Sequence, residues 1–275
     1  MVEINKIFVV VDPTTDQQSA LINAEWIASQ NSEISLHVYE AIFSSRDNAD
    51  REALQRVVTQ RHQAWVESLV EPMRAAGNDV TVEVEWTADW REAIPAAARR
   101  AGADLIVKAA STHSKNERRL LKTSDWTLLR GAHCPVYLVK KDSIVVGAKV
   151  LCALNLKAQD DLHDELNGRV IDYSKALIEK VPDSSLHAVN AYAGSDKFVY
   201  PDDLASTTGI DKTCAHSIEG SPDKVIPEIA DQIDASIVVI GTAARGGIKA
   251  AFVGNTAEKI LDEVRTNILI VNAEQ

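Results

Sequence analysis

The chain has 275 residues, of which 45% are hydrophobic and 25% charged, so its composition is that of globular domains and its length allows two of them. The net charge of −11, divided as −3 over residues 1–142 and −8 over residues 143–275, argues against a basic face and hence against a nucleic-acid partner. No apolar stretch approaches the ~18 residues of a membrane span, and residues 1–6 lack the basic and apolar regions of a signal peptide. We therefore expect a cytoplasmic protein with no membrane partner.

Short apolar runs alternate with stretches of helical spacing along the whole chain. In residues 1–142 they predict strands over 6–11, 36–41, 80–86, 104–109 and 136–139, and helices over 17–29, 51–75, 91–101 and 126–130. In residues 143–275 they predict strands over 149–154, 186–191, 213–218, 236–241 and 268–271, and helices over 169–181, 222–233 and 256–264. Residues 80–86 alternate apolar and polar side chains, which predicts that Val80, Val82, Val84 and Trp86 point inward. Short buried strands joined by crossover helices predict parallel, doubly wound α/β sheets.

The two halves of the chain are copies of one another. A shift of 132 places Ala93-Ile94-Pro95 on Val225-Ile226-Pro227 and needs no gap from residue 92 to residue 139. We call residues 1–142 the first copy and residues 143–275 the second copy, and we predict one five-stranded domain in each. The linker over residues 140–147 is short and not rich in Gly or Ser, so we expect the copies to be held close together.

The connection between the second and third strands differs between the copies. Residues 36 and 37 align with residues 186 and 187 at a shift of 150, whereas the shift is 132 from residue 92 onward. The connection is therefore 18 residues shorter in the second copy. Residues 192–209 have room for a turn or two of helix, which predicts that a covering helix has been lost. We expect a cleft or contact surface there, covered by a ligand, the other copy or a partner.

Glycines gather after the fourth strand of the second copy. Parallel strands end at one edge of a sheet, so the end of the first strand at Asn155 should lie near the end of the fourth strand at Gly241. Glycines let a backbone approach a phosphate, and a helix that begins near Thr256 would point its free N–H groups the same way. Alternatively, the glycines only form a turn, and Asn255 with Glu258 only caps a helix. The candidate site residues are Asn155, Gly241, Ala244, Gly246, Gly247, Gly254, Asn255 and Thr256.

The remaining reactive side chains give weaker signals. The cysteines are odd in number and lie in or beside apolar runs, so buried thiols are expected rather than disulfides: Cys134, Cys152 and Cys214. No spacing typical of metal ligands occurs, so no metal is expected. One basic cluster could be a solvated helix face or a patch for an anion or a partner: Lys115, Arg118, Arg119 and Lys122.

Three segments carry a resemblance to a known family. They are residues 10–13 (Val-Val-Asp-Pro), residues 123–130 (Thr-Ser-Asp-Trp-Thr-Leu-Leu-Arg) and residues 250–258 (Ala-Ala-Phe-Val-Gly-Asn-Thr-Ala-Glu) after Gly241-Thr242. On these marks the chain resembles the universal stress protein family, over its full length and in the tandem form. The resemblance implies two adenine-nucleotide alpha hydrolase-like domains. It also implies a pseudo-dimer through the last strands of the two copies, which would otherwise be exposed edges.

ATP-binding members of that family carry Gly-x2-Gly-x9-Gly-Ser/Thr and an acidic residue after the first strand. The second copy matches in part, because Gly241 and Gly254 are present while Ala244, Asn255 and Asn155 replace the middle glycine, the hydroxyl and the acid. The first copy keeps the acidic residue and none of the glycines, with Asp12, Ala109, Thr112 and Lys122 at the matching positions and Lys108 beside Ala109. The resemblance therefore implies ATP or a related nucleotide as the ligand, in the second copy alone.

The sequence gives little sign of catalysis. It has no Walker-type Gly-Lys-Ser/Thr and no Gly-x-Ser-x-Gly nucleophile elbow. The favoured interpretation is a non-catalytic stress-response sensor that binds a small molecule. Two alternatives stay open: an interaction protein with vestigial pockets, and a slow ATP hydrolase. Other stress proteins or a second copy of this chain are the protein partners that the resemblance suggests.

Overall fold

The computed structural model describes residues 2–43, 51–110, 118–141, 147–158, 160–242 and 255–273, without the side chains of residues 51, 118–124, 180 and 255. The chain divides into two compact units, one over Glu3–Asp142 and one over Ser143–Gln275 with the first two residues. These units correspond to the first and second copies, and each is considered by itself.

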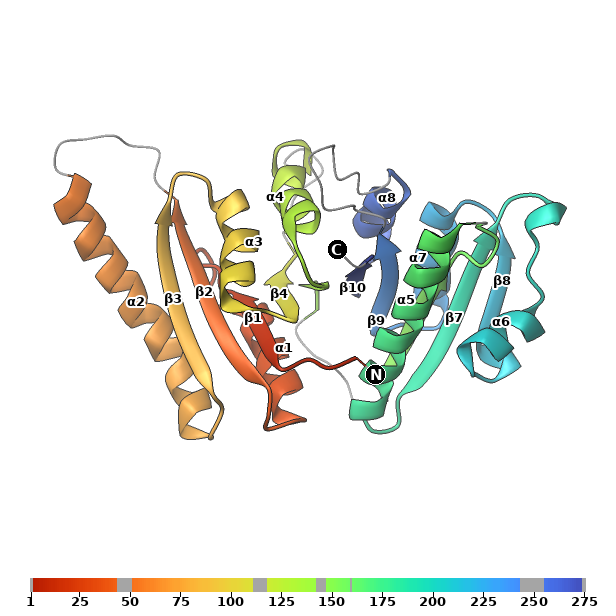
Figure 1. The fold of residues 1–275 in the computed structure, drawn as a ribbon, viewed down its shortest axis with the longest axis horizontal. Coiled ribbons are helices and arrows are strands. Elements are labelled where there is room, and N and C mark those ends of the chain that lie inside the picture. The colour runs from red at the N-terminus through yellow and green to blue at the C-terminus, as the bar shows by residue number, and fades with distance from the viewer. Residues whose placement is uncertain are drawn as a thin grey trace. The chain divides into compact units, whose positions relative to one another are not determined.

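The first copy contains a parallel sheet in the order β3-β2-β1-β4-β5 (Figure 1). Its strands are β1 (Lys6–Val10), β2 (Ser35–Phe43), β3 (Val80–Thr87), β4 (Leu105–Ala109) and β5 (Val136–Val139). Its helices are α1 (Ser19–Ser29), α2 (Arg51–Ala75), α3 (Trp90–Ala101) and α4 (Arg118–Gly131). The order reverses between β1 and β4, which is the switch point where ligands bind in sheets of this kind.

The second copy repeats that order as β8-β7-β6-β9-β10. Its strands are β6 (Lys149–Leu154), β7 (Ser185–Tyr192), β8 (Ala215–Glu219), β9 (Ile237–Thr242) and β10 (Asn267–Asn272). Its α-helices are α5 (Asp161–Lys180), α6 (Pro201–Thr208), α7 (Pro222–Gln232) and α8 (Asn255–Glu263), with short 3-10 turns η1 (Ser195–Lys197) and η2 (Lys212–Cys214). The predicted doubly wound α/β fold is therefore confirmed in both copies.

Helices cover both faces of each sheet, which explains the uniformly apolar central strands. Crossovers between parallel strands are right-handed, so helices that precede and helices that follow the reversal in strand order lie on opposite faces. In agreement, α3 and α4, which both follow the reversal in the first copy, pack beside each other, and so do α7 and α8 in the second copy. Ile7, Phe8 and Val9 in β1 are fully buried, as are Val238 and Val239 in β9. Strands buried on both faces read as continuous apolar runs rather than as alternating ones.

Three predicted elements need correction. Helix α5 begins at Asp161 rather than residue 169, because the side chain of Asp160 accepts the backbone N–H of His163 and caps a first part whose residues are largely polar. Helix α4 begins at Arg118 rather than residue 126, in a stretch without apolar periodicity. Strand β3 lies at the sheet edge, so Val80 is buried whereas Val82, Val84 and Trp86 are only half-buried.

The second copy has shortened the covering helix rather than lost it. Helix α6 has 8 residues, and it packs against β8 and β7 with Leu204 fully buried. Figure 1 shows α6 beside β8, whereas the first copy has the 25-residue α2 beside β3. Helix α6 thus contacts the face that was expected to need a ligand or partner as cover, and β8 on that side stays half-buried or exposed. The pairing of the two copies through their last strands stays a prediction.

No helix in the described ranges is long and apolar enough to cross a membrane.

Candidate functional site

A cleft of about 580 Å³ lies at the carboxyl ends of the strands of the second copy. Residues from β6, β7 and β9 form its floor, and residues from α5, α8 and the turn before α7 form its walls. Asn155, Gly241 and Thr256 all line it. The structure therefore brings together three of the candidate site residues that come from distant parts of the sequence.

The turn after β6 is held in place by two side-chain amides. Asn167 of α5 accepts the backbone N–H of Asn155 and donates to its carbonyl oxygen, both at 3.0 Å. Asn190 of β7 accepts the backbone N–H of Leu156 at 3.0 Å. Because Asn190 is 1% exposed and lines the cleft, its amide nitrogen is a donor left available there. Neither amide was predicted from the sequence.

Gly241 leaves room where α5 crosses the end of β9. A Cβ atom at this position would lie 3.4 Å from side-chain atoms of Leu166 and of Val170, at the tight limit of van der Waals contact. A larger side chain would have to displace α5 or enter the cleft. The packing of α5 therefore favours glycine at residue 241 even if no ligand binds in the cleft.

The next residue carries an unused hydrogen-bonding group. Thr242 is 2% exposed and lines the cleft, and its buried hydroxyl has no hydrogen-bond partner among the described residues. A buried hydroxyl without a partner is costly, so a polar ligand atom would improve the site. Ala244, Gly246, Gly247 and Gly254 lie outside the described residues, and so does the side chain of Asn255, where α8 begins.

The cleft combines basic side chains with a lining free of carboxylates. Lys157 and Lys197 both line it, and neither forms an ion pair within the described ranges. His163 also lines it, with Nδ1 placed 2.8 Å from the carboxylate of Asp160. No Asp or Glu occurs among the described lining residues, although the whole chain carries a net charge of −11. The cleft is suited to an anionic ligand.

The same edge of the first copy is occupied by its own side chains. Lys108 is 9% exposed, and its Nζ lies 2.8 Å from Asp125 and donates to the carbonyl oxygen of Ala109. Lys108 therefore lies within β4, beside the position that corresponds to Gly241. Its ion pair with Asp125 occupies the region where the second copy has its cleft.

A buried Glu–His pair lies at the end of β2 in the first copy. Glu40 is fully buried. One carboxylate oxygen lies 2.5 Å from Nδ1 of His62 on α2, and the other has no hydrogen-bond partner in the part of the chain that the structure describes. Burial raises the pKa of the Glu40 carboxyl, and Asp12 adds to this, while His62 opposes it. Glu40 corresponds in register to Asn190, and Pro13 to Leu156. Because proline has no N–H, Glu40 lacks the backbone donor that Asn190 uses.

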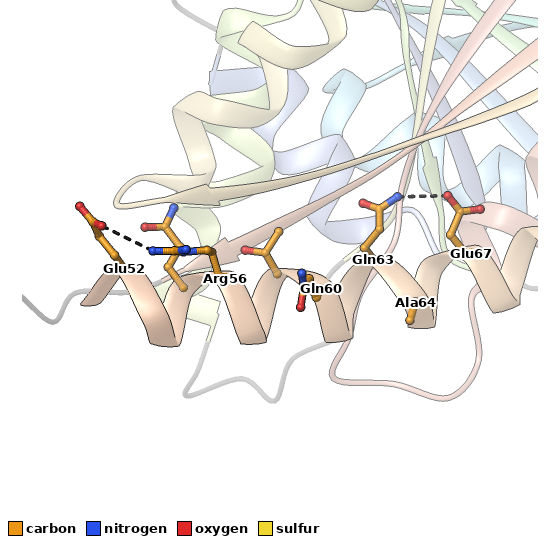
Figure 2. Close-up of a pocket in the computed structure, with 8 residues that line it drawn as sticks. Glu52, Arg56, Gln60, Gln63, Ala64 and Glu67 are labelled. Carbon is orange, nitrogen blue, oxygen red and sulfur yellow. Dashed lines mark hydrogen bonds and ion pairs between the residues drawn. The ribbon is translucent and has the colours of Figure 1, made fainter. Parts of the chain in front are cut away.

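A larger hollow of about 760 Å³ lies along α2 of the first copy (Figure 2). The described lining residues all come from that one helix, and Figure 2 shows side chains that bond to helix neighbours. Arg56 lies 3.8 Å from Glu52, and Gln63 donates to Glu67 at 3.1 Å. We do not assign this surface as the site, because a ligand there would stay largely in water.

The cysteines form no disulfide, and two of them are shielded from solvent. Cys134, Cys152 and Cys214 are all free thiols, and the first two are buried. Burial raises the pKa of Cys134 and of Cys152 to about 12, which keeps them protonated and unreactive at neutral pH. Among the described residues, no three His, Cys, Asp or Glu side chains are grouped as metal ligands would be.

Comparison with known proteins defines the class of protein. The model of the universal stress protein family matches residues 3–140 and again residues 163–272. The chain belongs to the universal stress protein family, with one family domain in each copy. It is 30% identical to universal stress protein E of Escherichia coli strain K12, over 97% of this chain and 93% of that protein.

Solved structures agree with the tandem form. A functionally unknown protein of Pseudomonas aeruginosa PAO1 superimposes with a TM-score of 0.81 at 27% identity, covering 98% of this chain and 93% of that one. A universal stress protein of Archaeoglobus fulgidus superimposes with a TM-score of 0.78 at 17% identity, covering 98% and 97%, which shows a shared fold.

Proposed function

We propose that this chain is a non-catalytic stress-response protein whose second copy binds ATP or a related nucleotide in its cleft. The observation that carries the proposal is the convergence of Asn155, Gly241 and Thr256 on one cleft of about 580 Å³. Gly241 and Asn155 are positions at which the sequence retains or modifies the family's nucleotide motif, and Thr256 lies in the helix that follows the motif. The free amide nitrogen of Asn190 and the unpartnered hydroxyl of Thr242 add donors for a polar ligand.

The ligand is expected in the second copy alone. In the first copy, the Lys108–Asp125 ion pair occupies the matching region. In the second copy, residue 240 is an isoleucine that lines the open cleft. Family membership supports a role in the stress response, and we propose a cytoplasmic location, as expected from the sequence.

The arrangement favours binding over hydrolysis. Hydrolysis of a nucleotide needs a positioned water and a group that accepts its proton. No carboxylate occurs among the described lining residues of the cleft. His163 also lines it, but its contact with Asp160 belongs to the N-terminal cap of α5. A slow hydrolase is therefore the second candidate, with His163 as the residue to substitute if phosphate release is detected.

The proposal is tested by mass spectrometry of the small molecules released when the purified, undialysed chain is denatured. A nucleotide in near-stoichiometric amount supports it. Ligand-free protein that also fails to bind added ATP would contradict it and favour an interaction protein with vestigial pockets.

A further inference from the structure

The two copies differ in charge at the turn that follows their first strands. In the first copy, Asp12 accepts hydrogen bonds from both the backbone N–H and the hydroxyl of Thr14, at 2.9 and 2.6 Å. The matching residues of the second copy, in register, are Asn155 and Lys157. One negative charge has been removed from this turn and one positive charge added.

A second lysine reaches the same cleft from the connection between β7 and β8. Lys197 lies in η1, within this shortened connection, and it lines the cleft together with Lys157. Both lysines are exposed, whereas Asn190, which lines the same cleft, is buried. Asn190 also fixes the turn that carries Lys157, through its bond to Leu156.

Lys197 follows the end of β7 and α8 follows the end of β9, while Lys157 follows β6, which lies between them. Strand β6 separates β9, which leads to α8, from β7, which leads to Lys197. Two spacings of about 4.8 Å put the ends of β9 and β7 roughly 10 Å apart. This span fits the sugar and 5′-phosphate of one nucleotide, with the phosphate near the N–H groups at the start of α8.

We infer that the second-copy cleft takes a nucleotide with two separate anionic groups: a 5′-phosphate at α8 and a further phosphate on the sugar, held by Lys157 and Lys197. This inference rests on the proposed function, because it assumes that the cleft binds a nucleotide. It explains why the lysines, the uncharged Asn155 and a lining without carboxylates occur together. A carboxylate at residue 155, as at Asp12, would repel the second phosphate.

The experiment compares two probes, AMP and adenosine 3′,5′-bisphosphate, by titration calorimetry on the intact chain. The bisphosphate is expected to bind about tenfold more tightly, which is the gain from one charge-assisted hydrogen bond. The variant Lys157→Gln/Lys197→Gln should lose that gain, measured as the ratio of the AMP and bisphosphate dissociation constants within the same variant. The control Lys212→Gln/Lys224→Gln makes the same change in charge at lysines outside the cleft lining, and it should keep the gain.

Each outcome decides between the claims. AMP binding with no added affinity for the bisphosphate overturns the inference and leaves the proposed function standing. An advantage that survives in Lys157→Gln/Lys197→Gln, or disappears in the control variant, also overturns it. If neither probe nor ATP binds, both claims fail. The single variant Lys157→Thr, which restores the first-copy residue, should lose part of the gain and serves if the double variant does not fold.

Discussion

The side-chain amide of Asn167 holds the backbone of Asn155 at both polar atoms, with two hydrogen bonds of 3.0 Å. In the first copy, Gln18 does the same for Asp12, accepting its N–H at 2.9 Å and donating to its carbonyl oxygen at 2.8 Å. The two amides do not align in sequence, yet each fixes the residue after the first strand. The position of that residue is therefore a common structural feature of both copies.

Asn167→Leu keeps the number and branching of the side-chain heavy atoms and removes both bonds to Asn155. We expect the free energy of unfolding to fall by about 1 kcal/mol, because the part-buried backbone N–H and carbonyl lose their partners. ATP binding should weaken as the turn loosens. Gln18→Leu is the matched change in the first copy, and it should destabilise the chain without altering ATP affinity. Urea unfolding and calorimetry measure the two effects, and weaker ATP binding in Gln18→Leu would contradict the assignment.

Glu40 makes the first copy less stable as pH rises. Burial raises the pKa of the Glu40 carboxyl above its ordinary value, so the folded chain holds this proton to a higher pH than the unfolded chain does. The protonated Glu40 carboxyl contributes its full stability below the pKa that Glu40 has in the unfolded chain. This contribution is lost as pH rises through the pKa that Glu40 has in the folded chain. Relative to wild type, Glu40→Gln should gain about 1 kcal/mol between pH 4 and pH 8. Urea unfolding at both pH values measures this, and a constant difference would contradict the direction of the shift.

The pair His187–His216 makes the second copy sensitive to acid. Nδ1 of His187 lies 3.3 Å from Nε2 of His216, and burial lowers the pKa of both rings, with mutual repulsion also lowering the pKa of His187. As pH falls below about 6.5, these two histidines take up protons in the unfolded chain before they do so in the folded chain. The free energy of unfolding therefore decreases from that pH until the folded pKa values are passed.

The first copy shows how to reverse that acid sensitivity. There, Nε2 of His37 lies 3.1 Å from the carboxylate of Glu83. In the register of the strands, Glu83 occupies the position that His216 has in the second copy. His216→Glu should retain more stability than wild type between pH 7 and pH 5, by at most about 1 kcal/mol after solvent screening. Thermal unfolding across that range measures it, and an equal or steeper loss in the variant would be inconsistent with the pairing.

ATP should bind without a large change in tryptophan fluorescence. All five tryptophans lie in the first copy: Trp26, Trp65, Trp86, Trp90 and Trp126. No tryptophan occurs in the second copy, and none is among the described lining residues of the cleft. Saturable binding by calorimetry with nearly constant emission is the expected result, and strong quenching that does not depend on Gly241 would move the site to the first copy.

The sequence predicted the fold class well because its repeat and its apolar periodicity show two copies of alternating strands and helices, as parallel, doubly wound sheets require. It also led to Asn155, Gly241 and Thr256, because parallel strands end at one edge of a sheet. It did not indicate Asn167, Asn190 or Lys197, which lie on a helix, a second strand and a short connection with no motif of their own. Their roles depend on hydrogen bonds and register that only the three-dimensional arrangement brings about.

The most direct test of the central claim is calorimetric titration of ATP onto wild type and two matched variants, Gly241→Val in the second copy and Ala109→Val in the first. A valine at residue 241 would crowd Leu166 and Val170 and enter the cleft, whereas Ala109 lies where Lys108 and Asp125 already fill the site. Thermal unfolding first establishes that both variants are folded at the titration temperature. The account predicts one saturable site in wild type and in Ala109→Val, and loss of binding in Gly241→Val. Undiminished binding by folded Gly241→Val, or its loss in Ala109→Val, would contradict it.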